Sequence, residues 1–121
     1  MKKSVFVLFV LFTAIACHAQ LAHTAWKGAI KGDNPQAAVL KFGKDTLVLK
    51  GADGSVLETM TFLLKAGTLT IKKISGQSDC DNVAAGKYTL VFSGNAFSIT
   101  LLADNCGDRS SALDKTRWVK Q

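Results

Sequence analysis

The sequence predicts an all-β fold, a single eight-stranded antiparallel up-and-down barrel. Beyond Gln20, apolar and polar residues alternate with a period of two, and turn-forming residues interrupt this alternation at regular intervals. Short links join consecutive hairpins of matched length. Eight such strands close most economically into a barrel, because closure removes both exposed edges. The expected strands cover residues 23–31, 36–43, 45–50, 55–64, 67–74, 86–93, 96–104 and 114–120.

The clearest hairpin is GKYTLVFSGNAFSITLLAD, residues 86–104. Gly94-Asn95 suits a two-residue primed turn, because both residue types tolerate a positive φ. With that tip, three apolar pairs oppose one another across the two strands, so one side of this hairpin is expected to be buried. These pairs are Phe92 with Phe97, Leu90 with Ile99, and Tyr88 with Leu101.

Two further hairpins follow the same pattern. In residues 57–74, a tip at Lys65-Ala66 pairs Phe62 with Leu69 and Met60 with Ile71, and Gly67 eases the turn. In residues 37–50, a tip at Lys44-Asp45 places Phe42 opposite Leu47 and Leu40 opposite Leu49.

Residues 1–19 are expected to be a cleavable signal peptide, followed by one domain over 20–121. Met1-Lys2-Lys3 is a positively charged start, Ser4 to Ala16 is an apolar run, and small residues precede a cut after Ala19. The apolar run is too short for a stable membrane-spanning helix. About 100 residues then remain, enough for one small domain.

A second processing route competes with cleavage after Ala19. The stretch Ala14-Ile15-Ala16-Cys17 loosely resembles a bacterial lipoprotein box, which would place a lipid on Cys17. In both routes Cys17 is unavailable for pairing, because it is either removed or acylated. The mature chain is expected to be exported to the periplasm, the outer surface or the medium, with no integral membrane span.

Cys80 and Cys106 are therefore expected to form a disulfide in an exported chain. They lie just beyond the open end of the 86–104 hairpin, so the bond would tie its base together. A zinc site is the rival interpretation. It would need more ligands than these cysteines and His23, the single histidine of the mature chain.

The sequence offers no catalytic constellation, and we expect neither an enzyme nor a cofactor. It contains no nucleophile elbow and no glycine-rich phosphate loop. The net charge of +6 includes two leader lysines, and the other lysines are spread along the chain, so no nucleic-acid partner is indicated. Four aspartates gather near the cysteines, and turn capping is the expected role rather than a calcium site. They are Asp79, Asp81, Asp104 and Asp108.

Many large apolar side chains should point into the barrel. An eight-stranded barrel is just wide enough to be filled by side chains or to hold one small ligand. For each inward residue taken alone, we expect core packing rather than contact with a ligand. Candidate ligand contacts are Phe42, Met60, Phe62, Tyr88 and Phe92.

The stretch GKYTLVFSGNAFSITLLADNCGDR, followed by Trp118, resembles small bacterial lipocalin-like domains of the calycin group. The resemblance covers roughly residues 22–120 and implies binding of a small apolar molecule inside the barrel. It also implies an arginine packed across the early tryptophan, so Arg109 or Arg117 would lie against Trp26. Thr24-Ala25-Trp26 departs from the family's Gly-x-Trp motif, and neither the family's longer chain nor its helix after the barrel is expected here.

Two functions follow as hypotheses. The first is an exported barrel that binds a small hydrophobic or amphipathic ligand in its interior. The alternative is a secreted protein-interaction or inhibitor domain, which would have a filled barrel and would contact its partner through loops. An exposed apolar patch at one rim would favour the alternative.

Overall fold

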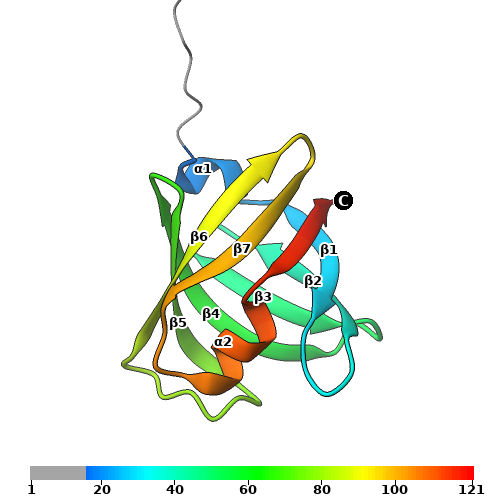
Figure 1. The fold of residues 1–121 in the computed structure, drawn as a ribbon, viewed down its shortest axis with the longest axis vertical. Helices are drawn as coiled ribbons and strands as arrows, with labels where there is room; N and C mark the ends of the chain where they lie inside the picture. The colour runs from blue at the N-terminus through cyan, green and yellow to red at the C-terminus, as the bar shows by residue number, and fades with distance from the viewer. Residues whose placement is uncertain (1–15) are drawn as a thin grey trace, which may run out of the picture.

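The computed structural model describes residues 16–121, which form a closed barrel of eight antiparallel strands in sequence order (Figure 1). The predicted all-β barrel is confirmed. Most of the predicted leader lies outside the described residues. The strands are β1 Ala25–Ile30, β2 Gln36–Phe42, β3 Thr46–Gly51, β4 Val56–Lys65, β5 Thr68–Gly76, β6 Ala85–Ser93, β7 Ala96–Ala103 and β8 Thr116–Lys120.

Two of the predicted hairpin registers are confirmed. Between β6 and β7, Phe92 faces Phe97, Leu90 faces Ile99 and Tyr88 faces Leu101. Between β2 and β3, the pairs predicted for residues 37–50 are also those observed. In both cases the alternation of apolar residues specified the face that is buried, and the turn specified the register.

The predicted register of the β4–β5 hairpin is wrong by two residues. The tip is Ala66-Gly67 rather than Lys65-Ala66, so Phe62 faces Ile71 and Leu64 faces Leu69. The physical reason is the turn, because both tip residues have positive φ, 50° and 77°, as a type I′ turn requires. A shift of two residues keeps every side chain on its predicted face, and Leu64 is buried on the same face as Met60 and Phe62.

Two short helices cover opposite ends of the barrel (Figure 1). Helix α1, His18–Leu21, lies at the end formed by the turns 43–45, 66–67 and 94–95, here called the α1 end. Helix α2, Gly107–Leu113, lies at the other end, here called the α2 end, with the connections 31–35, 52–55 and 77–84. The predicted strands left residues 105–113 as a connection, whereas helix α2 starts directly after Cys106. Within residues 16–121, no helix is long and apolar enough to cross a membrane.

The same local motif leads from each helix into the next strand. In both cases a buried leucine ends the helix, and a residue with positive φ and a threonine follow it. The threonine hydroxyl donates a hydrogen bond to the leucine carbonyl and accepts one from a tryptophan indole N–H two residues later. The two copies read LAHTAW, residues 21–26, and LDKTRW, residues 113–118. Each motif fixes a large aromatic side chain in the core of the barrel.

The centre of the barrel is filled by side chains. Tyr88 and Trp118 are fully buried. Large rings of this kind occupy the full width of an eight-stranded barrel. An empty volume is therefore expected only towards the ends of the barrel.

The predicted disulfide between Cys80 and Cys106 is confirmed, with the two Cα atoms 5.4 Å apart. Cys80 lies in the β5–β6 connection and Cys106 directly precedes α2. The bond therefore ties the base of the β6–β7 hairpin together, as predicted, and it also fixes the start of α2. A disulfide here is consistent with an oxidising, exported environment.

Replacing both cysteines by serine, C80S/C106S, should lower the free energy of unfolding by about 3.5 kcal/mol, the loop-entropy value for a closed loop of this length. The denaturant midpoint measures the change, and as a control a thiol reductant should destabilise the parent protein but not the double variant. A double variant as stable as the parent would show that the disulfide does not contribute to the free energy of unfolding.

Ala66 adopts a left-handed conformation that costs an alanine roughly 1 kcal/mol. Asparagine tolerates this conformation better, so Ala66→Asn should stabilise the protein by about 0.5–1 kcal/mol. The preceding position has ordinary strand geometry, and Lys65→Asn should give no gain. Thermal unfolding of the two variants distinguishes the observed register from the predicted one.

Candidate functional site

The α2 end contains a cavity of about 260 Å³. Residues from the ends of β1 and β3 and from the starts of β2 and β4 surround it, together with the β5–β6 connection and helix α2. The site is therefore the partly covered mouth of the barrel, which is where barrels commonly bind small molecules.

The floor of the cavity is apolar. Leu49, Met60 and Leu113 belong to the buried core, and Ile30 and Leu57 pack against that core. The alternation in β3 and β4 turns Leu49 and Met60 inward, and α2 lays Leu113 over them. A ligand that displaced water from this floor would gain hydrophobic free energy of roughly 25 cal/mol for each Å² of apolar surface covered.

One polar group at the cavity is the buried carboxylate of Glu58. It accepts hydrogen bonds from the backbone N–H of Ser78 at 3.1 Å and from the Ser78 hydroxyl at 2.7 Å. The ammonium group of Lys73 lies 3.7 Å from the same carboxylate and also donates to the Ser78 carbonyl. Glu58 thereby holds the β5–β6 connection against the start of β4.

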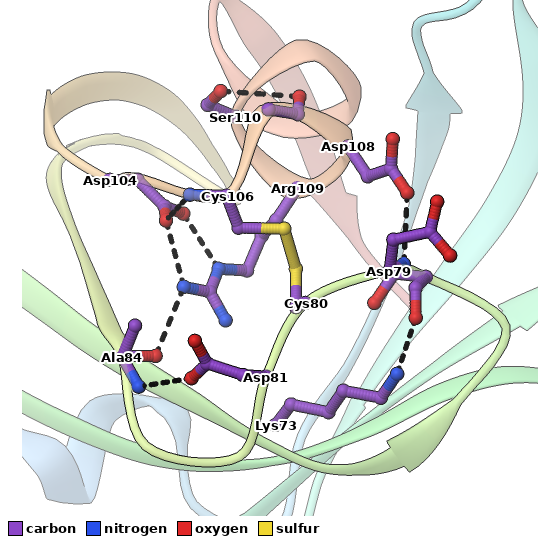
Figure 2. The surroundings of a disulfide bond; sticks show 12 residues. Lys73, Asp79, Cys80, Asp81, Ala84, Asp104, Cys106, Asp108, Arg109 and Ser110 are labelled. Carbon is purple, nitrogen blue, oxygen red and sulfur yellow. Dashed lines mark hydrogen bonds and ion pairs between the residues drawn. A yellow bond between two sulfur atoms is a disulfide. The ribbon is translucent and has the colours of Figure 1, made fainter.

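A second polar group is the guanidinium of Arg109 on α2, which forms a two-pronged ion pair with Asp104 (Figure 2). The distances are 2.6 Å from Nε and 2.8 Å from Nη2, and both side chains are almost completely buried. Nη2 also donates to the carbonyl of Ala84, and the Tyr88 hydroxyl donates to the carboxylate of Asp104. A Cβ on Gly86 would lie 2.3 Å from this carboxylate, so only glycine fits beneath the pair.

These contacts set the charge states of the cluster. Burial alone would raise the pKa of Asp104, but the hydrogen bonds from Arg109 and Tyr88 outweigh it and hold the pKa below its ordinary value. The hydrogen bond to Asp104 raises the pKa of Arg109. The pKa of Tyr88 is raised mainly by burial and also by the hydrogen bond to Asp104. At neutral pH the cluster is an ionised pair joined by a neutral phenol.

One nitrogen of the cluster is left without a partner. Arg109 Nη1 is buried and has no hydrogen-bond partner within residues 16–121. A buried N–H that lacks a partner costs about 1–3 kcal/mol. Arg109 lines the cavity with part of its side chain, and Nη1 itself is enclosed by protein atoms.

Three of the four aspartates near the disulfide accept hydrogen bonds from backbone N–H groups. Asp81 accepts them from Val83 and Ala84, Asp104 accepts one from Cys106, and Asp108 accepts one from Asp79 across the two connections (Figure 2). These carboxylates therefore act as loop caps. In the part of the chain that the structure describes, no group of three or more His, Cys, Asp or Glu is placed to hold a metal ion.

The predicted ligand contacts do not lie together. Met60 lines the cavity at the α2 end. Phe42 and Phe62 pack edge to face at the α1 end, with ring centroids 4.9 Å apart. Tyr88 is fully buried in the core, and Phe92 packs half-buried against Phe97 and Trp26.

The two arginines suggested as partners of Trp26 are placed differently from one another. Arg109 is paired with Asp104, and Arg117 is exposed on the outer face of β8. Trp26 packs against Phe97 with ring centroids 4.5 Å apart, and its indole N–H donates to the Thr24 hydroxyl. An aromatic neighbour and a hydroxyl thus surround this tryptophan.

Sequence reasoning did not identify Glu58 as part of the site, although a signal was present. The period of two that turns Met60 and Phe62 inward also turns Glu58 inward. The alternation therefore predicts an acidic side chain at the mouth of the barrel. Leu113 gave no such signal, because its burial depends on how α2 folds back over the mouth.

Comparisons with protein-family models, with curated proteins and with solved structures find no match to this chain. The class of protein is therefore defined by the fold alone. It is an eight-stranded antiparallel barrel with a partly covered mouth, compatible with a lipocalin-like fold.

Replacing Arg109 by methionine should leave the Asp104 carboxylate buried and unpaired, at a cost of about 3–5 kcal/mol at neutral pH. The lowered pKa of Asp104 means that the pair stabilises the fold above about pH 4 and that this contribution is lost as the pH falls. The difference between R109M and the parent should therefore shrink in acid. Denaturant unfolding as a function of pH measures both effects.

Arg117→Met is the matched control for this experiment. It removes the same group from an exposed position, so a change within about 0.5 kcal/mol is expected. Equal losses in the two variants would contradict the structural role assigned to the Arg109–Asp104 pair.

Proposed function

We propose that this protein is an exported, lipocalin-like binding module that holds a small amphipathic ligand in the cavity at the α2 end. The observation that carries the proposal is the cavity itself, which combines an apolar floor with a few fixed polar groups. This combination is typical of ligand sites, where apolar contacts supply affinity and polar groups supply orientation.

The size of the cavity supports a small ligand. A volume of about 260 Å³ lies just below the usual range for ligand pockets, about 300–1,000 Å³. The filled centre of the barrel closes the way to a deeper site. The ligand would therefore insert an apolar group at the mouth rather than occupy the whole interior.

The polar rim supports a ligand whose head accepts hydrogen bonds. Arg109 lines the cavity with one nitrogen unpaired, and the nearby Glu58 carboxylate already has partners in Ser78 and Lys73. We propose that a carbonyl, hydroxyl or carboxyl oxygen of the ligand pairs with this nitrogen after a small movement of the Arg109 side chain, because protein atoms enclose the nitrogen in the structure. Because Asp104 already neutralises Arg109, the site does not require an anionic head.

We propose binding without chemical change. The ionisable groups at the cavity are engaged in structural bonds, with Glu58 holding Ser78 and Arg109 holding Asp104. A catalytic acid or base needs a pKa near the working pH, whereas the Asp104 and Arg109 pKa values are moved away from it.

A protein-interaction domain is the second candidate, and one observation favours it. Val83 projects from the β5–β6 connection with 80% of its surface exposed, and Ile74 and Leu102 are also exposed. A large exposed apolar side chain on a rim loop can anchor a partner. Under this alternative the cavity would stay empty and Val83→Ser would abolish the complex.

Filling the cavity tests the proposal. Ala112 faces the cavity from α2, so Ala112→Phe should occupy it, whereas Ser111→Phe lies on the exposed side of the same helix. We expect A112F to weaken binding of decanoate and decanol at least tenfold, and S111F to leave it unchanged. Tryptophan fluorescence or calorimetry measures the affinity, and circular dichroism checks the fold.

The outcomes separate the two candidates. If neither compound binds the parent protein and no small molecule is extracted from it after purification, ligand binding at this site is wrong. If A112F and S111F bind equally well, a ligand exists but lies elsewhere.

A further inference from the structure

We propose that the α1 end of the barrel is a docking surface for an anionic lipid membrane. This inference goes beyond the proposed function, because it concerns the end of the barrel opposite the ligand cavity. It depends on the distribution of charge, on exposed apolar side chains, and on the point at which the chain enters the barrel.

The two ends of the barrel carry different charges. Of the nine acidic residues in the sequence, eight lie at the α2 end, in its connections or at the adjoining strand ends. Asp45 is the single acidic residue at the α1 end. Four exposed lysines lie at that end, in its turns or at the adjoining strand ends, and they are Lys41, Lys44, Lys65 and Lys120. The α1 end is thus basic, whereas the α2 end carries more acidic than basic residues.

Apolar side chains are exposed beside these lysines. Leu63 and Val91 are 54% and 56% exposed on the outer face of β4 and β6. Next to Val91, the tip of the β4–β5 hairpin borders a shallow groove of about 440 Å³. Ala16, Ala66 and the half-buried ring of Phe92 contribute to its lining. Lysines that surround exposed apolar groups are typical of surfaces that bind the membrane interface.

The chain enters the barrel at the same end. The backbone N–H of Gly67 donates to the carbonyl of Ala16 at 3.1 Å, and Cys17 forms a bridge with Lys65. The fifteen preceding residues include the apolar run that begins at Ser4, with Lys2 and Lys3 before it. A lipid on Cys17, the second processing route of the sequence analysis, would lie at this entry point and hold the α1 end towards a bilayer.

Anionic lipid fits this surface better than a protein or a nucleic acid. Four lysines on separate turns and strands are flexible point charges, which suit a fluid layer of headgroups more than a fixed partner. Each lysine near an anionic membrane strengthens its binding about fivefold. Docking in this orientation would leave the mouth of the ligand cavity facing away from the membrane.

The test compares two charge-reversed forms of the full chain, with the leader as the cell processes it. K44E/K65E changes the α1 end, and K31E/K115E makes the same net charge change on exposed residues at the α2 end. Flotation measures binding to vesicles of phosphatidylcholine with phosphatidylglycerol and to vesicles of phosphatidylcholine alone. We expect K44E/K65E to bind the anionic vesicles at least about tenfold less, K31E/K115E to bind like the parent, and added salt to weaken binding.

Other outcomes overturn the proposal. Equal losses in both double variants would show that net charge alone attracts the protein. Equal binding of the parent to the two vesicle types would show that lipid charge has no part. Decanoate binding to K44E/K65E is expected to remain at the parental level, so a failure of membrane docking is distinguishable from a failure of the ligand site.

Discussion

Closure of the sheet is the constraint on which the rest of the structure depends. β1 pairs with β8 through Trp26–Lys120 and Lys27–Val119, so neither strand is left as an open edge. Once the sheet closes, every second side chain must fit into one small interior. Tyr88 and Trp118 fill its width, and space is left at the mouth under α2. The location of the cavity is thus a consequence of how the centre is packed.

The two ends are finished by the same motif but differ in charge and in their surroundings. Each copy places a helix over the barrel and fixes a tryptophan through a threonine hydroxyl. At the α1 end the surroundings are basic and partly apolar. At the α2 end a disulfide, a buried ion pair and several loop-capping carboxylates hold the longer connections around the cavity. This difference is the basis of the proposed division between a membrane-facing end and a ligand-binding end.

Much of the fold could be predicted from local patterns. The alternation of residues predicted eight strands and their buried faces, and Gly94-Asn95 predicted a register that the structure confirms. The β4–β5 register was missed because two adjacent tips, Lys65-Ala66 and Ala66-Gly67, preserve the same faces. Only backbone geometry distinguishes them, through the positive φ at both tip residues. The repeated pattern L-x-x-T-x-W was visible in the sequence, but its role depends on hydrogen bonds that the sequence does not specify.

By itself, the sequence determined the all-β class, the inward faces of the strands and the disulfide between Cys80 and Cys106, because these depend on period, turn residues and cysteine number. The tertiary structure decided which inward residues are packed and which line a cavity. It also paired Arg109 with Asp104 and gathered the acidic residues at one end. These features depend on how α2 and the connections fold over a closed barrel, and residues distant in the chain meet only after that closure.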